Sequence, residues 1–226
     1  MILILGCGRS GTHLLAEAMK GPDTIVTAED SRWFDKALAI VRNSAKMHDY
    51  FPFILENWCF MQATAYGHGK EFVDKTHVAA WFYPEVKTLM DTKCIWIERE
   101  PLGAIASMKK HPGMRNDLRY APCFSVPNRY MGIEDESWFD LPLVKCFAKK
   151  WKSYQRRRDE LSADIDYYVQ YEDLVRNPEK EISMMEKQFG IRCSRPTMHV
   201  ETLDKWQNVL TQQEVSDINE ELESEY

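Results

Sequence analysis

The stretch MILILGCGRSGTHLL, residues 1–15, decides the fold class of this chain of 226 residues. Residues 2–5 are apolar and predict a short buried strand, and residues 11–19 predict the helix that follows it. The turn between them contains three glycines, Gly6, Gly8 and Gly11. Such a turn lets the backbone approach a ligand, and the helix N-terminus favours negative charge. The stretch therefore predicts a phosphate-binding loop, with a tight turn that binds no ligand as the alternative.

This loop lacks the lysine of the loops that bind ATP and GTP. Those loops read G-x-x-x-x-G-K-[ST], and their lysine reaches the β- and γ-phosphates while the next hydroxyl holds Mg²⁺. Here Gly6 and Gly11 have the right spacing, but Thr12 stands at the position of the lysine. The basic residue lies inside the loop instead, at Arg9. The loop therefore differs from the ATP- and GTP-binding version in the position of its basic residue.

The rest of the chain alternates between strand and helix signals, which is typical of a parallel α/β sheet flanked by helices. The expected strands are 25–28, 71–74, 93–97 and 166–170. The expected helices are 78–90, 101–110, 143–161, 178–189 and 211–222, with a further helical pattern over 31–66. The pattern predicts a single domain of the P-loop nucleotide-binding type over residues 1–226, with its anion site at the carboxyl ends of the strands.

One segment interrupts this alternation. Residues 111–142 contain four prolines and show no clear period. A loop of this length in a compact domain is usually functional. We therefore expect a lid or an acceptor-binding loop here.

Composition limits the partners of the chain. A net charge of -6 argues against nucleic acid, because binding to its backbone requires a basic surface. No stretch approaches the about 20 apolar residues that span a membrane. The six cysteines are scattered and no secretory signal is visible, which together predict a cytoplasmic protein with reduced thiols and no metal site.

Five motifs in the sequence resemble those of sulfotransferases that use 3′-phosphoadenosine 5′-phosphosulfate (PAPS). RSGTHLL (9–15) resembles the family's 5′-phosphosulfate loop, in which Lys or Arg precedes Ser-Gly-Thr. The other four motifs follow in the family's order and extend the resemblance to residue 220. They are VDKTHVAAWF (73–82), CIWIEREPLGAIASMKKH (94–111), YEDLVRNPEKEI (171–182) and KWQNVLTQQEVSDINE (205–220).

The resemblance implies an enzyme that moves a sulfuryl group from PAPS to a hydroxyl or amine by in-line displacement. The acceptor would be a small molecule, a glycan or a peptide, and no metal is implied. The residues implied to bind the nucleotide are Gly8, Arg9, Ser10, Gly11, Thr12, His13, Arg99, Ser107 and Tyr171. Of these, Arg99 and Ser107 match the family's 3′-phosphate segment. A surface ion pair for Arg99 and a purely structural role for Tyr171 are the alternatives.

The resemblance also implies catalytic roles. Arg9 and Lys75 would stabilise the charge that grows on the leaving phosphate. His77, in the Lys-Thr-His segment, would be the general base, since an imidazole titrates near neutral pH. The tyrosylprotein sulfotransferases instead use a glutamate about twenty residues after the loop, and this makes Glu29 or Asp30 the alternative base.

The sequence departs from the family pattern at two places. His13 replaces the second Thr of the usual Ser-Gly-Thr-Thr loop. His199, Val200 and Glu201 stand where cytosolic members carry Arg-Lys-Gly against the 3′-phosphate. The second departure leaves open what completes that site. It also keeps a non-catalytic nucleotide-binding protein as an alternative, beside a P-loop nucleotide kinase.

Two further features have two interpretations each. An aromatic set is either the wall of an acceptor pocket or plain core, and it comprises Trp33, Phe34, Trp81, Phe82 and Tyr83. The basic run KKWKSYQRRR (149–158) is either a solvated helix face or a surface that meets an anion.

Overall fold

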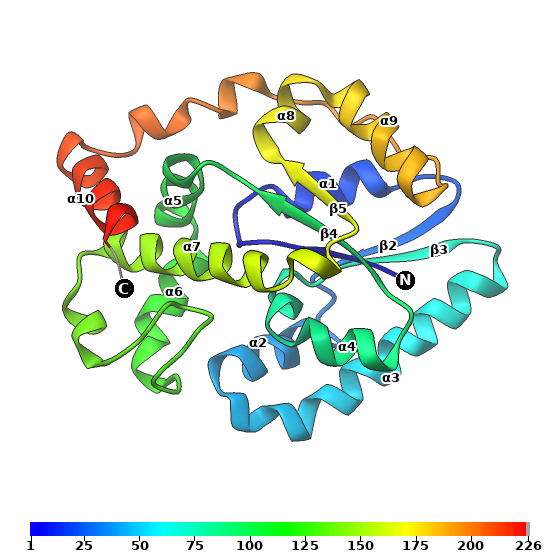
Figure 1. The fold of residues 1–226 in the computed structure, drawn as a ribbon, viewed down its shortest axis with the longest axis horizontal. Coiled ribbons are helices and arrows are strands. Elements are labelled where there is room, and N and C mark those ends of the chain that lie inside the picture. The colour runs from blue at the N-terminus through cyan, green and yellow to red at the C-terminus, as the bar shows by residue number, and fades with distance from the viewer. Residues whose placement is uncertain (225–226) are drawn as a thin grey trace.

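A parallel sheet of five strands forms the centre of the computed structural model, which describes residues 1–224 (Figure 1). The strands are β1 (Ile2–Leu5), β2 (Thr24–Ala28), β3 (Glu71–Lys75), β4 (Lys93–Glu98) and β5 (Tyr167–Gln170). Their order in the sheet is β2-β3-β1-β4-β5, and every neighbouring pair is parallel. The predicted α/β class, the parallel sheet and all five predicted strands are thus confirmed.

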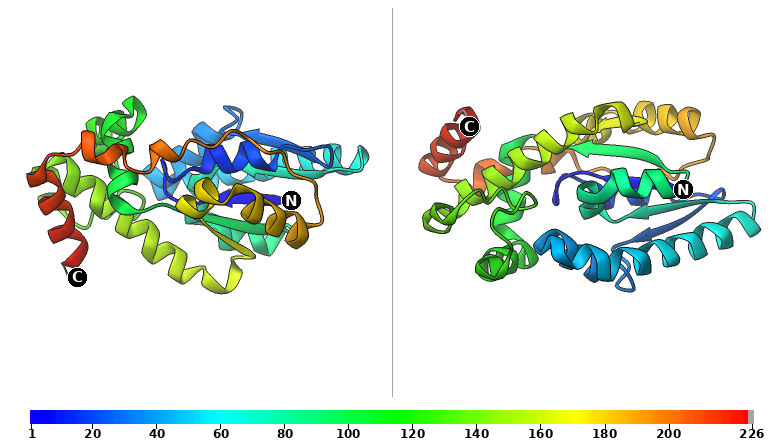
Figure 2. Two further views of the ribbon diagram at one scale, coloured as in Figure 1. Left: turned by 90° about the horizontal axis from the view of Figure 1, so that it is seen from above. Right: turned by 60° about the horizontal axis from the view of Figure 1, so that its bottom comes forward.

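Helices cover both faces of this sheet (Figures 1 and 2). They are α1 (Thr12–Met19), α2 (Phe34–Arg42), α3 (Met47–Gly67), α4 (Tyr83–Leu89), α5 (Pro101–Lys110), α6 (Pro112–Tyr120), α7 (Leu143–Glu160), α8 (Tyr171–Arg176), α9 (Pro178–Phe189) and α10 (Gln212–Glu223). Within residues 1–224, none of them is both long enough and apolar enough to cross a bilayer.

The alternation of side chains along β1 explains the two layers. Leu3 and Leu5 face a core that includes α2, α3, α4 and α7. Ile2 and Ile4 face the opposite core, which α1, α8 and α9 cover. Because both faces of β1 are buried, the strand is apolar throughout, as expected for the central strand of a parallel sheet.

Two predicted segments differ from the structure. The helical pattern over 31–66 is divided between α2 and α3, with a short 3-10 turn at Ser44–Lys46 between them. The segment 111–142 contains a helix, α6, that its sequence did not predict. Proline at the first turn starts α6, but the helix is short and mostly polar, and only its residues Met114 and Asp117 are buried, so little of it packs in the core.

The sheet brings residues from distant parts of the sequence to one edge. Because the strands are parallel, the residue that follows each strand lies at the same carboxyl edge. Glu29 follows β2, Arg99 follows β4 and Tyr171 follows β5. Lys75 ends β3, and the glycine-rich loop follows the central strand β1. This edge carries the candidate active site.

Candidate active site

Two glycines give the loop after β1 its course. Gly6 has φ +144°, and a Cβ there would lie 2.3 Å from the carbonyl oxygen of Ile97. Gly11 has φ +94°, and a Cβ there would lie 2.3 Å from the ring of Tyr171. Both positions therefore require glycine. The loop leads into α1, whose first amides have no acceptor within the helix.

The loop holds a buried polar group, the hydroxyl of Ser10. Among residues 1–224 it has no hydrogen-bond partner. A buried hydroxyl without a partner is costly, so this position suits a ligand that supplies an acceptor. Ser10 and the amides at the start of α1 are therefore positioned to hold an anion, as the sequence predicts.

Tyr171 connects this loop to the neighbouring strand end. Its ring packs on Gly11, and the Arg99 guanidinium lies 4.4 Å from the ring centroid. Its hydroxyl is 3.0 Å from the Thr202 hydroxyl. Tyr171 therefore fixes the distance between the loop, Arg99 and the C-terminal segment.

Arg99 points into the site and forms no ion pair with its neighbours in sequence. Its Nη1 donates to the Arg9 carbonyl at 3.4 Å, and its Nη2 donates to the Thr202 carbonyl at 3.2 Å. Glu98 pairs with Arg158 instead. The Nε of Arg99 is buried and has no hydrogen-bond partner in the part of the chain that the structure describes. This guanidinium thus keeps an unused donor beside the cavity described next.

A cavity of about 440 Å³ opens between the loop, α5 and the C-terminal segment. The residues that line it are Arg9, Arg99, Gly103, Ala106, Ser107, Lys110, His111, Pro112, Tyr171, Thr202, Lys205, Trp206 and Val209. We call it the nucleotide cavity, after the role that we propose for it below. The Arg9 Nε donates to the Ser107 hydroxyl at 3.2 Å, so the two predicted binding residues meet at its floor.

The segment in which the sequence departs from the family pattern, residues 199–201, does not itself line the nucleotide cavity, but residues that follow it do. His199 and Glu201 pair with each other at 3.1 Å and are exposed. They do not line the nucleotide cavity, whereas Thr202 and Lys205 do. Lys205 and Lys110 were not among the predicted binding residues. A single lysine in a helix or turn gives no sequence signal that it binds a ligand.

A second group of side chains gathers at the ends of β2 and β3. The Glu29 carboxylate contacts the Lys75 ammonium and lies 3.3 Å from Nδ1 of His77. The Nε2 of His13 is 3.5 Å from this carboxylate and 3.0 Å from the Lys75 ammonium. Glu29 has φ +52°, a left-handed backbone that is uncommon outside glycine and clusters at functional sites.

The electrostatics of this group follow from its burial. Burial lowers the pKa of His77 to about 4, although Glu29 opposes the shift, so the imidazole is neutral near pH 7. Burial would raise the pKa of Glu29, but hydrogen bonds from His13 and His77 and the charge of Lys75 outweigh it. The pKa of this carboxyl therefore lies well below its usual range. Burial also lowers the pKa of Lys75, with Glu29 opposing.

A smaller cavity of about 170 Å³ lies beside this group. Its lining combines the predicted catalytic side chains with residues of α2 and α6: Gly8, Arg9, Thr12, His13, Glu29, Phe34, Leu38, Arg42, Lys75, His77, His111, Gly113, Met114, Asp117 and Tyr130. We call it the acceptor cavity, again after the role that we propose for it. It shares Arg9 with the nucleotide cavity, so the two cavities meet at the loop.

The structure does not bring every candidate to this site. The Asp30 carboxylate turns to Arg32, with bonds of 2.9 and 2.7 Å, and does not line the acceptor cavity. Of the aromatic set, only Phe34 lines it. Trp33 and Tyr83 are fully buried in the core.

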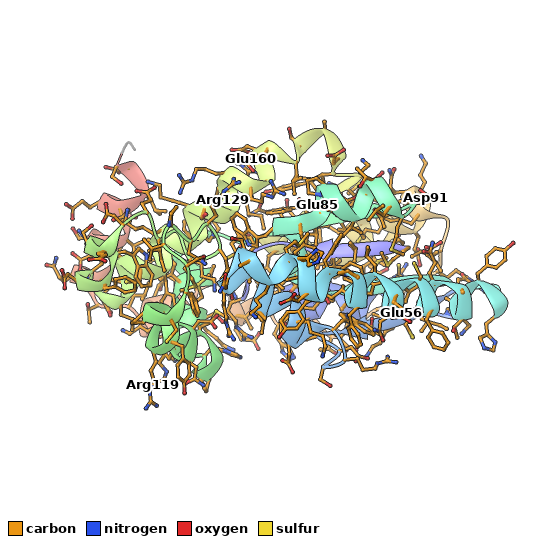
Figure 3. The ribbon with its side chains drawn as sticks, turned by 90° about the horizontal axis from the view of Figure 1, so that it is seen from below. Glu56, Glu85, Asp91, Arg119, Arg129 and Glu160 are labelled. Atoms are coloured by element: carbon orange, nitrogen blue, oxygen red, sulfur yellow. The ribbon has the colours of Figure 1, made fainter. Side chains whose placement is uncertain are left out.

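Trp81 and Phe82 line a separate cavity of about 340 Å³. Its rim includes Glu85 on α4 and Arg129 in the segment after α6, both labelled on the face seen in Figure 3.

The far wall of the acceptor cavity is a buried charge cluster that the sequence did not reveal. Asp117 on α6 accepts from Arg42 at 2.5 Å and from the Tyr130 hydroxyl at 2.8 Å. The ammonium of Lys150 lies 3.5 Å from the same carboxylate. Lys150 is fully buried. Four segments therefore meet at Asp117.

Lys150 belongs to the basic run 149–158, several of whose side chains make contacts within the protein, so the run is not a uniformly solvated face. Lys149 pairs with Glu221 on α10, Arg157 donates to the Ala80 carbonyl and Arg158 pairs with Glu98. The run instead ties α7 to its neighbours.

Comparison with known proteins identifies the family. A sulfotransferase domain model matches residues 1–224. The sulfotransferase domain from the curacin biosynthetic pathway is similar in structure, with a TM-score of 0.58 and 14% identity over 100% of this chain and 98% of that one. The sulfotransferase domain of the Synechococcus PCC 7002 olefin synthase has a TM-score of 0.58 and 16% identity over 100% and 95%.

Mouse sulfotransferase SULT7A1, solved in complex with PAP, has a TM-score of 0.53 and 15% identity over 97% of this chain and 82% of its own. A search of curated protein sequences finds no significant match. At these identities the structural neighbours establish the fold, while the domain model covers nearly the whole sequence. The chain therefore belongs to the sulfotransferase family.

Proposed function

We propose that this sulfotransferase uses PAPS as its donor and transfers the sulfuryl group to a hydroxyl or amine acceptor. One observation carries the proposal: a nucleotide-sized cavity and a smaller cavity meet at Arg9, with Lys75 in the lining of the smaller one. A sulfuryl group that leaves a phosphate in the larger cavity would reach an acceptor in the smaller one. On this path it would pass the two cations Arg9 and Lys75.

The donor would bind along the nucleotide cavity. Its 5′-phosphosulfate suits the loop residues, which are Gly8, Arg9, Ser10, Gly11, Thr12 and His13. Its 3′-phosphate suits the spare donor of Arg99 and the hydroxyl of Ser107. Lys110 and Lys205 line the same cavity and would supply the charge that Arg-Lys-Gly supplies elsewhere. Tyr171 would hold the loop and Arg99 at the spacing of the two phosphates.

Arg9 and Lys75 would act on the bond that breaks. In-line transfer of a sulfuryl group moves negative charge onto the bridging oxygen of the leaving phosphate. Fixed cations beside that oxygen stabilise the transition state more than the ground state. We propose that Arg9 and Lys75 stabilise this negative charge without a metal ion.

His77 is the base that the geometry favours. Its Nδ1 faces the Glu29 carboxylate, which orients the ring and leaves Nε2 as a proton acceptor. Its low pKa keeps the ring neutral over the physiological range. Glu29 is itself committed to Lys75 and two histidines, so we assign it the positioning of these groups. We do not assign the role of base to Asp30, because its carboxylate pairs with Arg32 outside the acceptor cavity.

The test has two parts. Calorimetry should show that PAP, the product 3′-phosphoadenosine 5′-phosphate, binds far better than ATP or AMP and needs no Mg²⁺. A screen of alcohols, phenols, amines, sugars and peptides with ³⁵S-labelled PAPS should then yield a labelled product. Turnover of ATP with Mg²⁺ would favour a kinase. Tight PAP binding without any sulfated product would favour a non-catalytic nucleotide-binding protein.

A further inference from the structure

Only two residues described in the structure line both cavities of the site, and one of them has no assigned role. They are Arg9, from the loop, and His111, at the junction of α5 and α6. The group in transfer must cross from one cavity to the other. Side chains that line both are therefore positioned to contact it, whereas those that line one contact only the donor or only the acceptor.

The local backbone presents the His111 ring to this junction. The His111 amide donates to the Met108 carbonyl at 3.0 Å and so ends α5, while its carbonyl accepts from Arg115 at 3.2 Å and so begins α6. The residue is thus fixed between two helices. Gly113 leaves room for the ring, because a Cβ there would lie 3.0 Å from Cε1 of His111.

The ring also has hydrogen-bonding capacity that the protein does not use. Its Nδ1 is buried and has no partner among the described residues. Burial and the nearby charge of Arg9 lower the pKa of His111, with Glu29 and Asp117 opposing. A neutral imidazole keeps one N–H donor and one acceptor. An unused donor beside Arg9 suits the oxygen atoms of an anionic group.

We infer that His111 is a catalytic residue that donates a hydrogen bond to the sulfuryl group as it passes between the two cavities. This inference rests on the proposed function and adds to it a contact specific to the transferred group. Arg9 would hold the leaving phosphate from one side. His111 would hold the sulfuryl oxygens at the point where they enter the acceptor cavity.

PAPS and PAP distinguish this role without any acceptor, because they differ by the sulfuryl group alone. Calorimetry on the full chain should show that His111→Ala weakens PAPS binding by about tenfold or more, as expected for a lost hydrogen bond to a charged group. PAP binding should stay within about twofold of the wild type. His68→Ala is the matched control, since His68 is exposed at the end of α3. His111→Asn, which keeps an N–H donor, should recover part of the PAPS affinity.

A second measurement uses the unaltered sequence and is independent of variant folding. In protein labelled with ¹⁵N-histidine, the ring signals of His111 should shift on addition of PAPS and much less with PAP. Equal losses of PAP and PAPS affinity in His111→Ala, or no loss of either, would overturn the inference. So would ring signals that respond alike to both nucleotides. If wild-type protein binds neither nucleotide, the proposed function fails as well, and this outcome is distinct from the others.

Discussion

The Glu29 carboxylate contacts the ammonium of Lys75 and lies 3.3 Å from Nδ1 of His77. One carboxylate from the end of β2 therefore contacts both the cation at the end of β3 and the proposed base just after it. It also keeps the buried Lys75 charge paired. In our proposal this carboxylate positions the two groups and is not the proton acceptor.

Replacing His77 with alanine should lower turnover by roughly 10²–10⁴-fold, the usual contribution of a positioned base. PAP affinity should change little, because the base faces the acceptor cavity. The assay is transfer from ³⁵S-labelled PAPS to the best acceptor from the screen. Arg9→Ala serves as the contrast, since it should lower both affinity and rate. Near-normal turnover of His77→Ala, with Glu29→Gln inactive, would assign the base to the carboxylate.

The pH dependence of turnover offers a separate test. Because burial lowers the pKa of His77 to about 4, the ring should accept a proton at all pH values well above 4 and lose this ability below it. The low-pH limb of kcat/KM, which reports the free enzyme, should therefore have its midpoint near pH 4, whereas an exposed histidine would give about 6.5. His77→Ala should abolish the limb. A wild-type midpoint between pH 6 and 7 would contradict a buried neutral base.

Arg99→Ala should reduce the preference for PAP over AMP, which differ only in the 3′-phosphate. Losing a charge-assisted contact with a phosphate should weaken PAP binding by at least about tenfold and leave AMP binding nearly unchanged. Ser107→Ala should act in the same direction with a smaller effect. Calorimetry with the two nucleotides gives both affinities. Equal losses for PAP and AMP would instead indicate that Arg99 supports the fold of the site.

The interval 112–123 should exchange amide hydrogens faster than 128–133 in the free protein. On α6 only Met114 and Asp117 are buried, whereas Tyr130, Met131 and Ile133 are almost fully buried. Few buried contacts favour local opening. Hydrogen exchange followed by mass spectrometry resolves the two intervals, and a bound acceptor should slow the first. Uniformly slow exchange across both would count against a lid.

Asp117→Ala should destabilise the protein by about 3–5 kcal/mol, because it leaves the buried charge of Lys150 without its carboxylate. Lys150→Met should cost less, since Arg42 and Tyr130 still hold Asp117. Denaturant unfolding measures both. Lys145→Ala on α7, the helix that also carries Lys150, is the control. Its partner Glu220 is largely exposed, so this ion pair should contribute little to stability. Asp117→Ala with the stability of the control would show that Lys150 does not depend on this pair.

The sequence predicted the strands and the loop because their signals are local. A run of four apolar residues followed by Gly6 and Gly11 specifies a strand, a turn and a helix start within a dozen positions. Lys75, His77, Arg99 and Ser107 could be singled out for a related reason. The first three lie at or just after a strand end and Ser107 lies on the helix that follows β4, and each belongs to a motif that resembles its counterpart in the family.

The rest of the site depends on contacts between segments that are far apart in the sequence. Lys205 lies in a short turn, and His111 lies between two helices, so neither has a local pattern that predicts a ligand. In the sequence, Asp117 and Lys150 look like ordinary surface charges, because only the folded structure brings them together. Asp30 and Glu29 are adjacent in sequence, yet only the Glu29 carboxylate lines the acceptor cavity, and its left-handed backbone has no signal in the sequence.

The nucleotide cavity has a consequence for how the protein is made. Its walls include Arg9, near the start of the chain, and Val209, near the end of the described residues. On the ribosome, where synthesis runs at about 5–20 residues per second, the loop emerges many seconds before the segment that closes it. A nascent chain would thus present only part of the cavity wall. If the cavity binds the proposed nucleotide, binding would become complete only after the segment around Val209 docks, and the bound nucleotide would then stabilise the contact between two segments that lie far apart in the sequence.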